Sequence, residues 1–231
     1  MILRAENLSV GYTKPILQNV NFAIENPCLI GVVGTNGAGK STLLKTLCGL
    51  TSALSGSIFV NEKNINTFSV QSLSEQVTYL PGAKTFHADL TVKELLFLAE
   101  DINDFAFYKT PELTENQRAI LQMLSIADLE NKALNKLSDG QYQLTSVAFS
   151  LCRNTPILLL DEPLAFLDFR NRKLLMNHLS ELPKKRQKTV LFSTHDLNVL
   201  SHCDSVWHIE NETMNVIEND SIVNFVKQLS E

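Results

Sequence analysis

The chain has 231 residues and a net charge of −5, and its length suits one large domain or two small ones with a buried core. No apolar run approaches the ~20 residues of a membrane-spanning helix, and the first residues lack the layout of a signal peptide. The densest basic stretch, residues 184–188, suits a solvated surface better than a nucleic-acid site, and four scattered cysteines suit a reducing compartment. We therefore expect a cytoplasmic protein that does not bind nucleic acid and that reaches a membrane only through a partner.

The N-terminal residues predict an antiparallel β-layer. Strand-like patterns cover residues 2–10 and 16–24, and a turn at 11–15 joins them. Tyr12 lies on this turn, where its position predicts exposure to solvent. These residues leave two interpretations open: a turn tyrosine without a ligand, or a flat aromatic ring on which an adenine stacks.

A phosphate-binding loop, G-x-x-x-x-G-K-S, follows the apolar stretch 29–33 and precedes a helical pattern at 43–48. Its residues are Gly34, Thr35, Asn36, Gly37, Ala38, Gly39, Lys40, Ser41 and Thr42. The glycines let the backbone turn tightly and aim its N–H groups inward, and the following helix adds its positive dipole end. Lys40 is placed to reach the β- and γ-phosphates, and Ser41 is placed to ligate Mg²⁺. The motif in this context predicts binding of a nucleoside triphosphate.

A change of hydrophobic period divides the middle of the chain. Strand patterns at 57–60 and 77–80 give way to apolar residues at helical spacing. We expect residues 83–155 to form an all-helical subdomain that is inserted into a catalytic core made of residues 1–82 and 156–231. The predicted fold class is therefore α/β.

The helical part contains stretches of different character. Residues 137–141, Leu-Ser-Asp-Gly-Gln, begin a helix that Ser138 is able to cap. No charged residue occurs from Gln141 to Cys152, so we expect this helix to be largely buried. Residues 101–111 predict a loop, for which the sequence indicates no role.

Carboxylates and a histidine follow two apolar strands of the core. Asp161 and Glu162 come directly after the strand 157–160, and His195 follows the strand 189–194. A loop that merely begins with two acids is the simpler alternative, but open α/β sheets bind their ligands at this end of their strands. We therefore predict that Asp161 ligates Mg²⁺, usually through water, that Glu162 polarises the attacking water, and that His195 donates a hydrogen bond to the γ-phosphate.

The phosphate loop, the motif at 137–141, the acidic pair at 161–162 and the Thr-His-Asp triplet at 194–196 follow one another over nearly the whole chain. In this order and spacing they resemble the nucleotide-binding subunits of ATP-binding-cassette (ABC) transporters. The resemblance implies ATP and Mg²⁺ as cofactors and an integral membrane permease as partner, on the inner face of the cell membrane. It also implies a P-loop NTPase core with a mixed sheet, helices and an N-terminal antiparallel β-layer.

The resemblance further implies a homodimer or a paired cassette that sandwiches two ATP molecules head to tail. Ser138 and Gly140 of one copy would contact the ATP that the phosphate loop of the other copy holds. Tyr12 matches the adenine-stacking position, and Asp168 matches the main residue of a loop that signals across the dimer. Because the γ-phosphate is contacted from both sides, ATP binding would close the dimer and hydrolysis would open it.

Three features depart from the family pattern. The third position of Leu-Ser-Gly-Gly-Gln is Asp139 here, and we expect its carboxylate to point away from the nucleotide because like charges repel. Gly82 stands where the family carries a glutamine that contacts the metal or the attacking water, which puts the coupling of the helical subdomain in question. Leu144 and Phe149 replace arginines, so packing rather than charge is expected to hold that helix.

Residues 164–172, together with Leu-Ser-Asp-Gly-Gln, are similar to ATPases of iron-chelate and cobalamin importers. The leading interpretation is an ATP-hydrolysing subunit that energises a separate permease. Two alternatives stay open: a cassette ATPase with a cytosolic role outside transport, and a slow switch that closes on ATP but scarcely hydrolyses it. Glu162 and His195 favour hydrolysis, whereas Gly82 and Asp139 are consistent with the switch.

Overall fold

The computed structural model describes residues 1–86, 89–100 and 112–230 and divides into two compact units. The first, called the core unit below, comprises Met1–Tyr79, Thr155–Glu162 and Met176–Glu231. The second, called the helical unit, comprises Leu80–Asn154 and Pro163–Leu175. The second segment of the helical unit lies outside the insert that the sequence predicts. The loop predicted at 101–111 falls outside the described residues.

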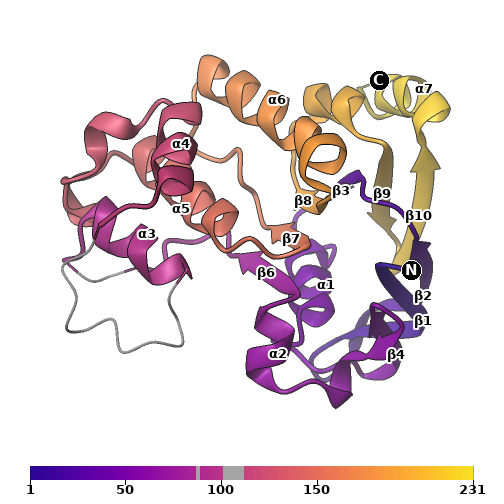
Figure 1. Cartoon of the computed structure of the whole chain (residues 1–231). Helices are drawn as coiled ribbons and strands as arrows, with labels where there is room; N and C mark the ends of the chain where they lie inside the picture. The colour runs from indigo at the N-terminus through magenta and orange to yellow at the C-terminus, as the bar shows by residue number, and fades with distance from the viewer. Residues whose placement is uncertain (87–88, 101–111, 231) are drawn as a thin grey trace. The chain divides into compact units, whose positions relative to one another are not determined.

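A six-stranded mixed sheet runs through the core unit in the order β10-β9-β3-β8-β7-β6 (Figure 1). Its strands are β3 (Leu29–Gly34), β6 (Val77–Leu80), β7 (Ile157–Leu160), β8 (Thr189–Ser193), β9 (Ser205–Glu210) and β10 (Thr213–Glu218). Strands β7, β8, β3 and β9 pair in parallel, whereas β10 is antiparallel to β9. Every residue of β7 and β8 is buried, which explains why these strands are nearly free of polar side chains. Parallel pairing brings the carboxyl ends of β3, β7 and β8 to one edge of the sheet.

A second sheet of the core unit is antiparallel and has the order β2-β1-β4-β5. Its strands are β1 (Leu3–Gly11), β2 (Pro15–Ile24), β4 (Ser55–Val60) and β5 (Lys63–Asn64). Strand β1 pairs with both neighbours, because Leu3 lies opposite Ile24 of β2 and opposite Val60 of β4. The predicted antiparallel layer at the N-terminus is therefore confirmed, and the turn that carries Tyr12 joins β1 to β2.

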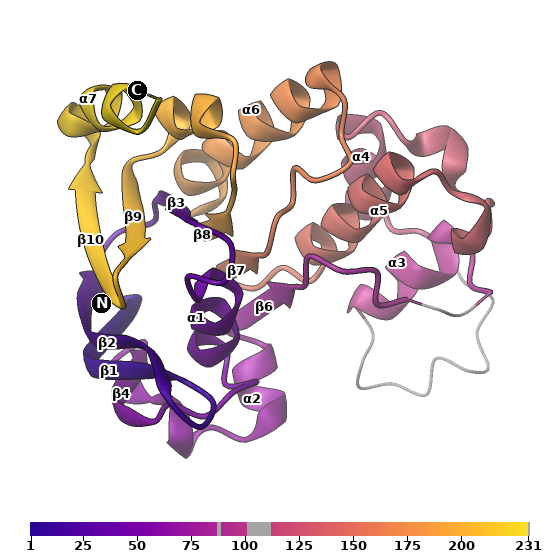
Figure 2. The same cartoon turned by 180° about the vertical axis from the view of Figure 1, so that it is seen from behind.

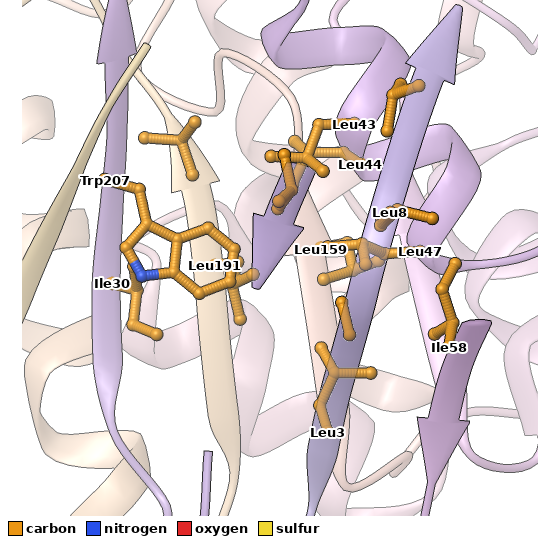
Figure 3. Close-up of a cluster of buried hydrophobic side chains, with 14 of the residues drawn as sticks. Leu3, Leu8, Ile30, Leu43, Leu44, Leu47, Ile58, Leu159, Leu191 and Trp207 are labelled. Carbon is orange, nitrogen blue, oxygen red and sulfur yellow. The ribbon is translucent and has the colours of Figure 1, made fainter. Parts of the chain in front are cut away.

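Helix α1 (Lys40–Leu47) contributes its apolar face to a cluster that includes strands of both sheets. Figure 3 shows Leu43, Leu44 and Leu47 of this helix near Leu8 of β1 and Leu159 of β7. All five side chains are fully buried. Since burial of a leucine side chain contributes about 1.5–3 kcal/mol, this cluster fixes the helix that begins at the phosphate loop.

The other helical elements of the core unit are η1 (Ile65–Thr67), α2 (Val70–Ser74), η5 (Leu197–His202) and α7 (Asn219–Ser230). Helix α6 (Phe169–Arg186) has residues in both units. Helix α7 packs against η5 and the β9–β10 hairpin. Among the described residues, no helix is both long and apolar enough to cross a membrane.

The helical unit is built around α5, with α3 and α4 beside it (Figure 2). Its elements are α3 (Val92–Glu100), α4 (Glu115–Met123), η3 (Ala127–Leu129), η4 (Leu134–Lys136) and α5 (Asp139–Cys152). Gln117 joins α4 to α3, because its Nε2 donates a hydrogen bond to Leu96 O at 2.8 Å. Most residues of α5 are buried, as its lack of charged side chains beyond the first turn predicts.

Candidate active site

The phosphate loop lies between β3 and α1 in the core unit, where the sequence predicts it. Gly39 is the N-cap of α1 with a φ of 107°, and an added Cβ would lie 2.8 Å from Ile16 Cγ2. Gly37 has a φ of 80°, and an added Cβ there would meet no atom within 4 Å. Left-handed backbone favours glycine at both positions, and Gly39 also lacks room for a side chain. The N–H groups of the first turn of α1 have no acceptor within the helix, so this loop is suited to an anion.

Lys40 holds its ammonium group against the loop. Its Nζ donates hydrogen bonds to Gly34 O at 2.8 Å and to Thr35 O at 3.1 Å, and the residue is only 7% exposed. Burial lowers the pKa of Lys40, while the carboxylates of Glu162 and Asp161 act in the opposite direction. A partly desolvated cation beside backbone N–H donors suits the β- and γ-phosphates of a nucleotide.

Asp161 follows β7 directly and is buried, with 6% of its surface exposed. Ser193 Oγ donates a hydrogen bond to Asp161 Oδ1 at 2.6 Å, and the Tyr79 hydroxyl donates one to Oδ2 at 3.3 Å. Burial and the neighbouring carboxylate raise the pKa of Tyr79, so its phenol remains a hydrogen-bond donor. The Asp161 carboxylate is therefore oriented from two sides.

Glu162 and His195 lie in direct contact, since Glu162 Oε1 is 2.8 Å from His195 Nε2. The Glu162 backbone has a φ of 50°, which is uncommon for a residue other than glycine. Burial raises the pKa of Glu162, the charges of His195 and Lys40 lower it, and Asp161 raises it. A carboxylate with a raised pKa, held at a strained backbone position, suits the role of a proton acceptor.

Ser193 and Tyr79 also belong to this site, although the sequence does not predict them. Ser193 is the last residue of β8, and its hydroxyl accepts from the Glu162 N–H at 2.8 Å while donating to Asp161. Ser193 could have been predicted from its position, because a serine ends a buried strand two residues before His195. Tyr79 is 82 positions from Asp161 in the chain, and no local pattern connects the two.

The residues predicted to hold Mg²⁺ are the Ser41 hydroxyl and the Asp161 carboxylate, both oxygen donors of the kind that this ion prefers. Within residues 1–86, 89–100 and 112–230, no group of three His, Cys, Asp or Glu side chains is placed to hold a metal ion. Because Ser41 and Asp161 supply oxygen atoms, they fit a Mg²⁺ ion that also takes phosphate oxygens and water as ligands.

Tyr12 lies on the turn between β1 and β2 of the core unit and is 61% exposed. The stacking of adenine on this residue requires an accessible ring face, and the exposure meets that requirement.

Ser138 and Asp168, which were predicted from two different motifs, lie at two helix starts of the helical unit. Ser138 is the N-cap of α5, where its Oγ accepts from the Gln141 N–H at 3.3 Å and Gln141 Oε1 accepts from the Ser138 N–H at 3.1 Å. Asp168 Oδ1 accepts from the Asn171 N–H at 2.8 Å at the start of α6. Gly140 has no room for a side chain, because an added Cβ would lie 2.9 Å from Phe166 O.

A hollow of about 550 Å³ in the helical unit brings these residues together. Ser138, Gly140 and Asp168 line it, as do Asp139 and Phe166. The structure thus places the three predicted residues on one concave surface. The Asp139 carboxylate lies 2.6 Å from Lys84 Nζ, an ion pair that the sequence did not indicate.

A family model for the ABC transporter matches residues 17–165 of the chain. The chain belongs to the ABC transporter family. It is an ATP-binding subunit of this family and hydrolyses ATP, which confirms the prediction made from its motifs. The phosphate loop, the end of β7 and the start of α5 all lie within the matched residues.

Three relatives of this ABC ATPase are named for the transport of a metal or a metal chelate. The iron(3+)-hydroxamate import ATP-binding protein FhuC of Bacillus subtilis is 30% identical over 85% of this chain and 74% of its own length. The ferric enterobactin transport ATP-binding protein FepC of Escherichia coli is 31% identical over 85% of this chain and 73% of its own. The manganese transport system ATP-binding protein MntB of Bacillus subtilis is 33% identical over 83% of this chain and 76% of its own.

Solved structures show the same cassette fold. A bacterial ABC transporter cassette, determined as a dimer, has a TM-score of 0.82 at 22% identity and covers 94% of this chain and 99% of its own. An ABC transporter described as of the metal-chelate type, in an inward-facing conformation, has a TM-score of 0.78 at 23% identity and covers 95% of this chain and 84% of its own. These likenesses confirm the predicted α/β fold class.

Proposed function

We propose that this chain is the ATP-hydrolysing subunit of an importer, that it drives a separate membrane permease, and that the cargo is an iron chelate. The grouping of Asp161, Glu162 and His195 with Lys40 of the phosphate loop in the core unit carries the proposal. The relatives FhuC and FepC, which are named for iron(3+)-hydroxamate import and ferric enterobactin transport, support the cargo.

In the proposed mechanism, the phosphate loop binds the β- and γ-phosphates through its N–H groups and Lys40. Ser41 and Asp161 would hold Mg²⁺, and the ion would supply positive charge that offsets the charge of the phosphates. Glu162 accepts a proton from the attacking water as the water oxygen bonds to the γ-phosphorus and the bond to the ADP oxygen breaks. His195 orients the Glu162 carboxylate through their 2.8 Å contact and, in the ATP complex, donates a hydrogen bond to the γ-phosphate.

Two copies, or this chain and a paired cassette, would complete two such sites. The hollow that Ser138, Gly140 and Asp168 line in one copy would receive the γ-phosphate that the other copy's phosphate loop holds. Tyr12 would stack on the adenine of the same nucleotide. The dimeric cassette among the similar structures supports this assembly. Closure of the dimer would then act on the permease at the inner face of the cell membrane, a location that the likeness to a transporter supports.

Uptake by whole cells tests the proposal. In a strain that lacks this chain, we expect the wild-type chain to restore ATP-dependent uptake of radioactive iron(3+)-hydroxamate, and Glu162→Gln not to restore it. Glu75→Gln, an exposed carboxylate at the end of α2, is the matched control and should restore uptake fully.

Manganese ion is a second candidate cargo, because MntB is as similar to this chain as the iron-chelate relatives are. Radioactive Mn²⁺ supplied to the same strains separates the two. Restored manganese uptake without restored iron-chelate uptake would overturn the proposed cargo, and restoration of neither would overturn both candidate cargoes.

A further inference from the structure

The segment that follows Gly82 packs against α5 in the helical unit and is hydrogen-bonded to it. The Thr85 and Phe86 N–H groups both donate to the Tyr142 hydroxyl, at 3.1 and 2.8 Å. The Phe86 ring meets the Phe149 ring edge-on at a centroid distance of 5.1 Å. Phe149 is one of the positions where the sequence departs from the family pattern, and the aromatic pair explains how packing replaces charge there.

Lys84 of the same segment pairs with Asp139, the third residue of the Leu-Ser-Asp-Gly-Gln motif. Its Nζ lies 2.6 Å from Asp139 Oδ1 and 5.2 Å from the centroid of the Tyr142 ring. The aromatic face and the carboxylate therefore hold one cation between them. Lys84 thus connects the segment after Gly82, where the family carries a glutamine, to Asp139, where the family carries a glycine.

The position of Asp139 creates an electrostatic problem for the proposed dimer. Asp139 lines the same hollow as Ser138 and Gly140, the residues proposed to contact a γ-phosphate. An unpaired carboxylate there would repel the phosphate, because two negative charges at short range repel each other. The ammonium group of Lys84 neutralises that carboxylate at the edge of the hollow.

We propose that Lys84 is a positioning residue for ATP-driven dimerisation, which holds the Asp139 carboxylate away from the nucleotide of a second copy. The inference rests on the proposed function, since it requires that the hollow receives a γ-phosphate. Lys84 and Asp139 are 48% and 60% exposed, so their ion pair contributes little to folding stability. We expect the ion pair to act instead on dimerisation, because it reduces the negative charge near the γ-phosphate of the second copy.

A double-mutant cycle in the full chain tests this role. All variants carry Glu162→Gln to slow turnover, and the fraction of dimer is measured by light scattering against the concentration of Mg-ATP. We expect Lys84→Ala to raise the half-maximal ATP concentration about two- to fivefold, the scale of an exposed ion pair. Asp139→Gly should not raise it, and the double variant should behave like Asp139→Gly, because the repelling carboxylate is gone.

Two controls distinguish an electrostatic role of Lys84 from a purely structural role. Lys136→Ala removes an exposed lysine of the same unit that lies outside this ion pair, and it should leave the ATP dependence unchanged. At about 1 M salt, where the screening length falls to ~3 Å, the defect of Lys84→Ala should shrink. A purely structural role would instead weaken the double variant as much as Lys84→Ala, at any salt concentration, and that result would overturn the inference.

The outcome for the parent protein distinguishes this inference from the proposed function. If Glu162→Gln alone binds ATP and stays monomeric, the proposed dimer is wrong. If Glu162→Gln dimerises and Lys84→Ala has no effect on it, only the role of Lys84 is wrong.

Discussion

Glu162 combines the properties that a general base requires at this site. Its carboxylate is half-buried, contacts His195 and lies near the cation of Lys40, and burial raises its pKa. A raised pKa makes the carboxylate a better proton acceptor, while the neighbouring positive charges keep it ionised. The Glu162 backbone lies in the left-handed region, which is uncommon for a residue other than glycine and is typical of functional sites.

Replacement of this carboxylate should separate binding from chemistry. We expect Glu162→Gln to lower ATP turnover by ~10²–10⁴-fold, the usual scale for loss of a general base, while ATP affinity changes little. Phosphate release and binding of a fluorescent ATP analogue measure the two quantities, with Glu75→Gln as the matched control. Turnover that stays within threefold of wild type, on the order of measurement scatter, would remove Glu162 from the proposed role.

The charge of His195 lowers the pKa of the adjacent Glu162 carboxylate, so its removal should change the pH dependence of turnover. Protonation of Glu162 ends its function as a base, so turnover should fall on the acid side of the pH profile. The charge of His195 lowers the pKa of Glu162, and its loss therefore raises that pKa. We expect His195→Gln to reduce turnover by about 10²-fold, the scale for a lost phosphate donor, and to move the acid limb to higher pH.

The pH profile of kcat, measured at saturating Mg-ATP, checks this prediction. His202→Gln is the matched control, because this histidine lies in η5 and its Nδ1 contacts Val199 O at 3.2 Å. An acid limb that stays in place or moves to lower pH would show that His195 does not act on Glu162.

At the scale of elements, two strand ends assemble the site. Strand β7 supplies Asp161 and Glu162, and β8 ends in Ser193, whose hydroxyl bonds to both. The sequence predicted the first two because an acidic pair after an apolar strand is a contiguous pattern. It did not predict Ser193, because only the parallel pairing of β7 with β8 brings residues 32 positions apart within 2.6 Å.

Other features of the fold and the site differ in the same way in whether they depend on local sequence or on distant contacts. The phosphate loop, the N-cap Ser138 and the burial of α5 follow from local spacing, so they could be predicted. The contacts of Tyr79 with Asp161 and of Lys84 with Asp139 span 82 and 55 positions, and they depend on how the chain folds back on itself. The inclusion of Pro163–Leu175 in the helical unit is likewise a product of packing.

Loss of the Ser193 hydroxyl should affect both stability and turnover. Ser193→Ala leaves the Asp161 carboxylate and the Glu162 N–H each without this partner, and we expect a loss of about 1–3 kcal/mol in the free energy of unfolding. Turnover should fall about 10- to 100-fold, as for other residues that orient a metal ligand.

Denaturant unfolding and steady-state turnover measure these effects. Ser150→Ala is the matched control, since its hydroxyl donates to Ser146 O one turn earlier in α5, and it should change both quantities little. Ser193→Thr keeps the hydroxyl and should retain turnover. A Ser193→Ala variant with normal turnover would show that the Asp161 carboxylate needs no such support.

Lys188, which precedes β8, introduces a pH dependence into the stability of the core unit. It is 4% exposed, and its Nζ donates to Thr155 O at 2.6 Å. Burial lowers its pKa from 10.5 to about 8. Between these two values the unfolded chain binds more protons at this residue than the folded chain does, so this group makes the protein more stable as the pH rises from 8 to 10.5.

We expect the difference in unfolding free energy between Lys188→Met and the wild type to report this effect. Below pH 8 the variant avoids the cost of a buried cation, and its advantage should decline by about 3 kcal/mol as the pH rises through the window. Comparison with the wild type at each pH cancels the contributions of the titratable groups that the two proteins share. A difference that does not change with pH would show that Lys188 is not desolvated.

At the scale of the whole molecule, the predicted machinery is divided between two units. The core unit holds the phosphate loop with Asp161, Glu162 and His195, and the helical unit holds the hollow lined by Ser138. Each unit carries only part of what the proposed mechanism needs around a γ-phosphate. The proposed mechanism therefore requires a second copy, whose helical unit would complete the site of the first.

The mass of the Glu162→Gln chain in solution tests this claim most directly. The chain has a mass of 25.8 kDa, and light scattering after size exclusion measures it with Mg-ATP and with Mg-ADP. We expect the mass to double with Mg-ATP and to remain that of a monomer with Mg-ADP, and Ser138→Arg, which fills the hollow, to prevent the doubling. A chain that binds Mg-ATP and still elutes as a monomer would contradict the account.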